Sequence, residues 1–206
     1  MEKRVLTDRS EGRAAVEAYR PAQIVSGGQT GVDRAALDAA IALGLPHGGY
    51  CPRGRRAEDG IIDRLYELRE TPSRDYPQRT EWNVRESDAT LVLHRGRPSG
   101  GTLLTIRLAE RMARPCLAID VDDSDAVERI AHWLDRVRPG VLNIAGPRES
   151  SSPGIRDSTA TLLMRLFRSD SPDLHPHAPA SSETPRPDER PTNGQIARPG
   201  ELDRGG

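Results

Sequence analysis

The sequence predicts an α/β protein with an open, mainly parallel sheet and helices on both faces. Short apolar runs such as "IVS", "ATLVLH", "CLAID" and "VLNIAG" alternate with longer amphipathic stretches. Three of these runs lead through loops rich in glycine and hydroxyl residues into an expected helix. Right-handed crossovers bring all strand-to-helix loops of such a sheet to its carboxyl edge, where ligands bind.

The first strand-turn-helix unit has a clear local pattern. A strand is expected at 24–26, and the glycines at 27–28 permit a turn. Thr30 and Asp33 have the spacing of a capping box at the start of the next helix. That helix is apolar on nearly every side, which predicts burial, and it should end at Gly44.

The later elements continue the alternation. We expect strands at 89–94, 116–120 and 141–146, and helices at 80–86, 100–114, 124–137 and 153–167. Ser124 and Ser152 are the expected N-caps of the last two helices, with Pro153 at the first helical position. Segment 61–70 fits a short helix or a strand-like excursion. The expected core-facing residues are Leu103, Leu104, Ile106 and Leu108; Val127, Ile130, Trp133, Leu134 and Val137; and Ile155, Leu162, Leu163, Leu166 and Phe167.

Composition predicts one folded domain with two appendages. The chain has 206 residues, a hydrophobic fraction of 35% and a mean hydropathy of -0.65, and the apolar deficit is concentrated at its ends. Segment 1–21 is expected to be a loose arm, and 22–168 is large enough for a single core. Segment 169–206 is rich in proline, serine and charge, which predicts a disordered tail.

Charge and cysteine content exclude several functional classes. A net charge of -1 gives no electrostatic footprint for nucleic acid. Cys51 and Cys116 have neither metal-site nor secreted-disulfide spacing, and no signal peptide or membrane-spanning apolar run is visible. We therefore expect a cytoplasmic protein with no metal site. No catalytic motif is present, so no catalytic residue is assigned.

The loops at 27–33, 96–102 and 146–152 predict an anion or nucleotide-like site. Each follows an expected strand and precedes a helix, so all three should converge, with free backbone amides at the positive ends of the helices. Lys3 is the only lysine, so the loops lack the usual phosphoryl-transfer lysine.

Several polar residues have two interpretations. Arg53, Arg55 and Arg56 form either a solvated charge run or an anion clamp. Asp33 is either a capping partner or a group that orients an arginine or a ligand amine. Arg79 and Asn83 either reach the cleft or belong to a polar helix surface, and Arg148 either contacts ligand or pairs with Glu58 or Asp59.

The blocks "GGQTGVDRAALDAA", "GYCPRGRRAEDG", "SDATLVL", "GGTLLT" and "NIAGPRESSSPGI" resemble those of the molybdenum carrier family, Rossmann-like proteins similar to molybdenum cofactor carriers. The resemblance covers 24–167. It implies a homo-oligomer, dimer or tetramer, that binds and protects the phosphorylated pterin of molybdenum cofactor without chemistry and passes it to molybdoenzymes. The candidate ligand-binding residues are Ser26, Gly27, Gly28, Gln29, Thr30, Arg53, Arg56, Ser99, Gly100, Gly101, Thr102, Arg148 and Ser150.

The alternative is an enzyme. The lysine-decarboxylase-like phosphoribohydrolases, which cleave nucleoside monophosphates, carry P-G-G-x-G-T-x-x-E. The nearest stretch here is "RPSGGTLLT", in which Thr105 stands where the catalytic glutamate belongs. Threonine cannot serve as a carboxylate base, which favours binding of cofactor or another nucleotide-like ligand over hydrolysis.

Overall fold

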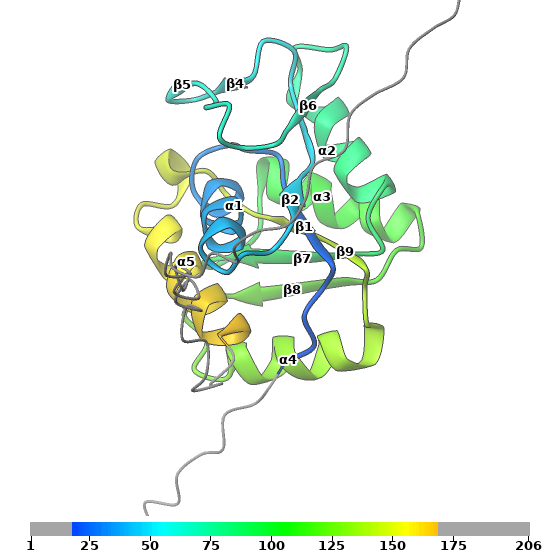
Figure 1. The fold of residues 1–206 in the computed structure, drawn as a ribbon, viewed down its shortest axis with the longest axis vertical. Coiled ribbons are helices and arrows are strands. Elements are labelled where there is room, and N and C mark those ends of the chain that lie inside the picture. The colour runs from blue at the N-terminus through cyan, green and yellow to red at the C-terminus, as the bar shows by residue number, and fades with distance from the viewer. Residues whose placement is uncertain (1–17, 169–206) are drawn as a thin grey trace, which may run out of the picture. The chain divides into compact units, whose positions relative to one another are not determined.

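The computed structural model describes residues 18–168. Five strands in this range form one parallel sheet, in the spatial order β2-β1-β9-β7-β8 (Figure 1). They are β1 (Gln23–Val25), β2 (His47–Gly48), β7 (Ala89–His94), β8 (Cys116–Asp120) and β9 (Val141–Ala145). The predicted α/β, Rossmann-like class is therefore confirmed. The proposed tail, 169–206, and most of the proposed arm, 1–21, lie outside the described residues.

Helices cover both faces of the sheet, as predicted. One face shares its core with α1 (Val32–Ala42), α4 (Ala126–Val137) and α5 (Ile155–Phe167). The other face carries α2 (Tyr76–Arg85) and α3 (Gly100–Arg111), which enclose a smaller apolar cluster. Figure 1 shows α1 beside α5 and α2 beside α3.

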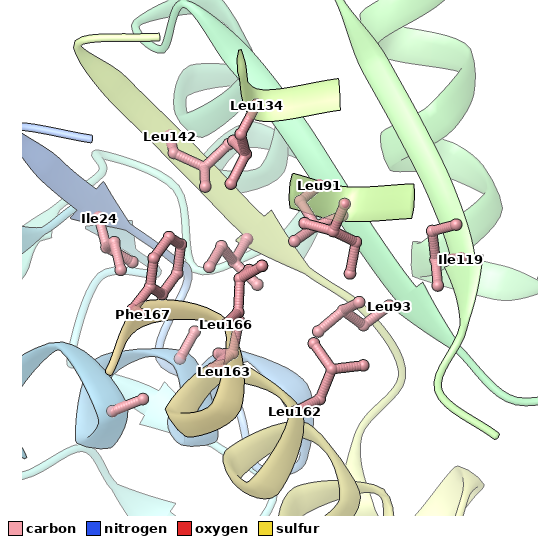
Figure 2. Close-up of a cluster of buried hydrophobic side chains, with 14 of the residues drawn as sticks. Ile24, Leu91, Leu93, Ile119, Leu134, Leu142, Leu162, Leu163, Leu166 and Phe167 are labelled. Atoms are coloured by element: carbon pink, nitrogen blue, oxygen red, sulfur yellow. The ribbon is translucent and has the colours of Figure 1, made fainter. Parts of the chain in front are cut away.

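The main core joins alternate strand residues to one stripe of α5. Leu91 and Leu93 of β7 point into it, since side chains two positions apart share a face of a strand. Figure 2 shows these leucines facing Leu162, Leu163 and Leu166 of α5. The predicted faces of α4 and α5 are confirmed, and each large side chain removed from water contributes about 1.5–3 kcal/mol.

The expected helix starts were wrong in detail. Gly31, with a φ of 72°, is the N-cap of α1. The Thr30 hydroxyl donates a hydrogen bond to Glu58 instead of capping the helix. α4 begins after Asp125 rather than Ser124, and α5 begins after Gly154, so Ser152 and Pro153 precede it. For α1 and α5 a glycine with a positive φ takes the place of the expected cap residue.

Two helices differ further from the prediction. α2 begins at Tyr76, four residues before its expected start at Thr80, because Asp75 and Pro77 provide a workable first turn. In α3 the buried residues are Thr102, Thr105, Leu108 and Ala109, so only Leu108 of the four expected core leucines and isoleucines is buried. The two buried threonines, Thr102 and Thr105, also line a pocket.

Segment 49–75 forms a separate layer next to β2. In it β3 (Tyr50–Cys51) pairs with β6 (Arg69–Glu70), and β4 (Arg56–Ala57) pairs with β5 (Gly60–Ile61) in a hairpin. Segment 61–70 is mostly turns with short strands at its ends, not a helix. Its conformation is held by Arg55, whose guanidinium donates to the carbonyls of Ile62, Asp63, Tyr66 and Leu68.

Candidate ligand-binding pocket

A pocket of about 360 Å³ lies where the three predicted loops meet. The loops after β1, β7 and β9 reach it because the carboxyl ends of parallel strands lie at one edge of the sheet. The first turn of α2 forms the remaining wall. The lining residues are Gln29, Asp33, Tyr76, Pro77, Arg79, Thr80, Ser99, Gly100, Gly101, Thr102, Leu104, Thr105, Ala145, Gly146, Pro147, Arg148 and Ser151.

An ion pair between Asp33 and Arg79 forms one side of the pocket. Arg79 Nη1 donates to Asp33 Oδ2 at 2.9 Å, and the Gln29 amide approaches the same oxygen at 3.4 Å. Burial raises the pKa of Asp33, and the opposing effect of Arg79 does not fully offset it. A Cβ on Gly27 would lie 1.7 Å from Arg79 Nη1, so the glycine makes room for this guanidinium.

Two buried donors in the pocket wall have no partner among the described residues. They are Gln29 Nε2 and Arg79 Nε. The orientation of the Gln29 amide is defined, because its Oε1 accepts the amides of Thr30 at 3.0 Å and Glu58 at 2.8 Å. A buried donor left unpaired costs about 1–3 kcal/mol, so these nitrogens are suited to an acceptor that enters the pocket.

The start of α3 forms the opposite wall. Ser99 is the N-cap but its side chain makes no capping hydrogen bond, and Gly100 has a φ of 52°. The first amides of a helix have no intrahelical acceptor and lie at the positive end of the helix dipole. A Cβ on Gly101 would meet nothing within 4 Å, so a ligand can approach the backbone closely. Thr105, in contrast, donates its hydroxyl to the Gly101 carbonyl at 3.0 Å.

An aromatic ring connects two arginines at the pocket. The guanidinium carbons of Arg79 and Arg148 lie 6.0 and 5.7 Å from the centroid of the Tyr76 ring. Arg148 is also 3.7 Å from Glu58 Oε2, and its side chain is 43% exposed. The pocket therefore offers two cations and one flat ring to a ligand.

Residues 24–167 match the circularly permutated YpsA SLOG family. The chain belongs to this family. Its similarity extends to the crystal structure of a protein from Syntrophus aciditrophicus named "Putative molybdenum carrier protein". The two are 46% identical with a TM-score of 0.71, over 74% of this chain and 98% of that one. A comparison with curated proteins returns no match.

These similarities confirm the family resemblance seen in the sequence, and in broad terms they support a ligand-binding role for this SLOG protein. Among residues 18–168 there is no group of three or more His, Cys, Asp and Glu side chains able to hold a metal ion. No helix in the same range is both long and apolar enough to span a bilayer.

Six of the predicted binding residues of this SLOG chain line the pocket. They are Gln29, Ser99, Gly100, Gly101, Thr102 and Arg148. Ser26 is fully buried outside the lining and donates its hydroxyl to the Ile144 carbonyl at 2.6 Å, and Gly28 packs against Leu68 and Ile62.

The remaining predicted residues lie elsewhere. Gly27 is covered by Arg79, and Thr30 and Ser150 donate hydroxyl groups to Glu58. Arg53 and Arg56 are exposed and do not line the pocket.

Sequence reasoning considered Arg79 of α2 but missed the other pocket residues of this helix. Tyr76, Pro77 and Thr80 were not considered, because no glycine loop precedes this helix to mark it as part of the sheet edge. The two interpretations of Asp33 and Arg79 are resolved by their pairing with each other. Arg148 pairs with Glu58, as one of its two interpretations predicted, and it also lines the pocket; its contact with a ligand stays a prediction.

Proposed function

We propose that this protein binds a phosphorylated ligand in the pocket, with the phosphorylated pterin of molybdenum cofactor as the favoured ligand. The observation that carries the proposal is the pair of unpartnered buried donors, Gln29 Nε2 and Arg79 Nε, in one wall. Both nitrogens can only donate hydrogen bonds, and an oxyanion can only accept them. The residues present therefore fit an anionic ligand.

The two walls suit different parts of such a ligand. A phosphate is best accommodated at the start of α3, where the amides of Gly100 and Gly101 meet the positive end of the dipole. A planar ring fits beside Tyr76, between the two arginines. A volume of about 360 Å³ falls at the lower end of the range for small-molecule sites.

The proposed role is binding and protection without chemistry. Asp33 is the only carboxylate among the described lining residues, and its pairing with Arg79 makes it a poor general base. Thr105 uses its hydroxyl within the helix. The similarity to a protein named as a molybdenum carrier supports cargo binding. The proposal includes a cytoplasmic homo-oligomer, dimer or tetramer, that delivers the cofactor to molybdoenzymes.

The test is to purify the full chain from cells that make molybdenum cofactor and from a strain blocked in its synthesis. Oxidation of the bound fraction should release a fluorescent pterin, accompanied by molybdenum, only from the first preparation. Gln29→Glu should abolish the signal, because it preserves the Oε1 acceptor and replaces the orphan donor with a repelling oxygen.

Arg53→Ala is the matched control, since Arg53 is exposed and outside the pocket, and it should retain the pterin. Equal pterin in the wild type and Gln29→Glu would reject the pocket as the site. Release of base from nucleoside monophosphates that disappears in Asp33→Asn, at a temperature where its melting curve shows the variant folded, would reject binding without chemistry and favour the phosphoribohydrolase alternative.

A further inference from the structure

The Glu58 carboxylate occupies a cradle of hydrogen-bond donors beside the pocket. Glu58 lies in the turn between β4 and β5. It accepts hydrogen bonds from the Thr30 hydroxyl and from both the hydroxyl and the amide of Ser150, the last at 3.2 Å. The guanidinium of Arg148 lies 3.7 Å from the same carboxylate. Four donors from two of the sheet-edge loops thus converge on one anion.

The cradle has the chemistry of an oxyanion site. Hydroxyl, amide and guanidinium groups are the usual protein ligands of phosphate, and a carboxylate presents the same kind of acceptor oxygens. Burial raises the pKa of Glu58, but the hydrogen bonds from Ser150 and Thr30 and the charge of Arg148 outweigh it, so the pKa is lowered. The cradle therefore favours a negative charge in this position.

The cradle adjoins the pocket. Arg148 belongs to both. The Glu58 amide donates to Oε1 of Gln29, a pocket-lining residue whose Nε2 has no partner among the described residues. Displacement of Glu58 would therefore enlarge the anion-binding surface without changing the walls around Tyr76 and Gly101.

The hairpin that carries Glu58 is short and mostly exposed, although Arg55 and the buried Ile62 anchor its two ends. Its two strands have two residues each, and Arg56, Gly60 and Ile61 are exposed. The neighbouring carboxylate, Asp59, pairs with Arg34 at 3.3 Å, and its side chain is 49% exposed. Arg34 is only 11% exposed, so this pair keeps the backbone of the turn in place, and a competing anion need displace only the Glu58 side chain.

We propose that Thr30, Arg148 and Ser150 form a second anion subsite, which Glu58 fills in the free protein and vacates for a ligand that carries two anionic groups, such as a diphosphate. This inference rests on the proposed function, because the subsite extends the same pocket. Glu58 then acts as an internal competitor that selects against ligands with a single weak anion.

The experiment follows the amide signals of Ser150 and Gly101 in ¹H–¹⁵N spectra of the full chain during titration with inorganic phosphate, with sodium chloride of equal ionic strength as reference. In Glu58→Ala, the phosphate concentration that half-saturates the shift of the Ser150 amide signal should be at least about tenfold lower than in the wild type. The apparent affinity is proportional to the fraction of molecules whose cradle is open, so removing the Glu58 carboxylate raises it.

Asp59→Ala is the matched control, because it removes the other carboxylate of the same turn and leaves Glu58 in place; its Ser150 response should equal that of the wild type. Glu58→Gln, which keeps the shape and one acceptor, should give an intermediate response, and its melting temperature checks that loss of folding is not the cause. Adding Ser150→Ala to Glu58→Ala should remove the gain.

An unchanged or absent Ser150 response in both Glu58 variants would overturn the subsite, as would an equal gain in Asp59→Ala. The Gly101 amide separates this inference from the proposed function. Phosphate-dependent movement at Gly101 without movement at Ser150 would reject the subsite alone, whereas movement at Ser150 without movement at Gly101 would reject phosphate binding at the start of α3.

Discussion

Arg79 Nη1 donates to Asp33 Oδ2 at 2.9 Å, although the two residues are 46 positions apart in the chain. Asp33 belongs to α1 and Arg79 to α2, on opposite faces of the sheet. Their side chains are 2% and 12% exposed. The pair therefore joins the two layers of the protein, and both of its residues line the candidate pocket.

Asp33→Asn should destabilise the protein strongly. The substitution keeps the shape of the side chain but leaves a buried guanidinium without a counter-charge, for which we expect a loss of about 3 kcal/mol in the free energy of unfolding. Urea denaturation measures this loss. Asp59→Asn, in the half-exposed pair with Arg34, should cost less than about 1 kcal/mol. Equal losses in the two variants would contradict a structural role for the buried pair.

Gly27→Ala should displace Arg79. Gly27 does not have a positive φ, so its backbone accepts alanine, but the new Cβ would lie 1.7 Å from Nη1 and 2.4 Å from Cζ of Arg79. Overpacking of this kind typically costs about 1–3 kcal/mol, and the moved guanidinium should also weaken phosphate binding about tenfold or more. Calorimetric titration and thermal unfolding of the same preparation measure both effects.

Gly101→Ala should separate stability from binding. A Cβ at Gly101 meets nothing within 4 Å, and alanine in a helix is more stable than glycine by about 0.5–1 kcal/mol. The methyl group would nevertheless project where we expect phosphate to approach the backbone. A variant with a higher melting temperature and weaker phosphate binding is expected, whereas tighter binding would place the phosphate elsewhere.

Arg55→Lys should loosen the layer formed by 49–75. Arg55 donates to four carbonyls of 62–68, and a lysine ammonium cannot span them. We expect a loss of about 2–3 kcal/mol, together with faster amide exchange at Ile62 and Leu68. Arg56→Lys, at an exposed position of the same segment, should change stability by less than about 0.5 kcal/mol. Slow exchange retained in Arg55→Lys would argue against this role.

Acid should release the contacts of Glu58. Its folded pKa lies below the ordinary value of 4.5, so the stabilisation is present above that value and is lost as the pH falls through the lower folded pKa. Glu58→Gln should lack this acid-dependent loss. Melting temperatures of both proteins from about pH 7 to about pH 3 should therefore converge at the acid end. Parallel curves over the whole range would show that the carboxylate contributes no charge-dependent stability.

Much of the scaffold could be predicted from local pattern. The apolar run of β7 and the stripe from Ile155 to Phe167 in α5 were recognised because burial of a strand or a helix face repeats along the chain with a fixed period. The meeting of the loops at Gln29, Gly101 and Arg148 also followed, because parallel connectivity brings strand ends to one edge.

The hydrogen-bond and ion-pair partners of the polar side chains could not be predicted from local sequence patterns. Thr30 had the spacing of a cap, yet its hydroxyl bonds to Glu58 and leaves the cap to Gly31. No periodicity relates Thr30 to Glu58, or Asp33 to Arg79, because these contacts depend on how separate layers pack. Tyr76, Pro77 and Thr80 of α2 were missed because no glycine loop precedes this helix.

The sequence by itself determined the class of the sheet, the order of its helices and the edge where a ligand would bind, because these follow from periodicity and from the direction of the strands. Only the tertiary structure decided which polar groups remain free at that edge. Gln29 and Arg79 keep unpaired donors, while Thr30 and Ser150 are engaged by Glu58. The choice depends on the distance between side chains that are remote in the chain, and folding alone sets that distance.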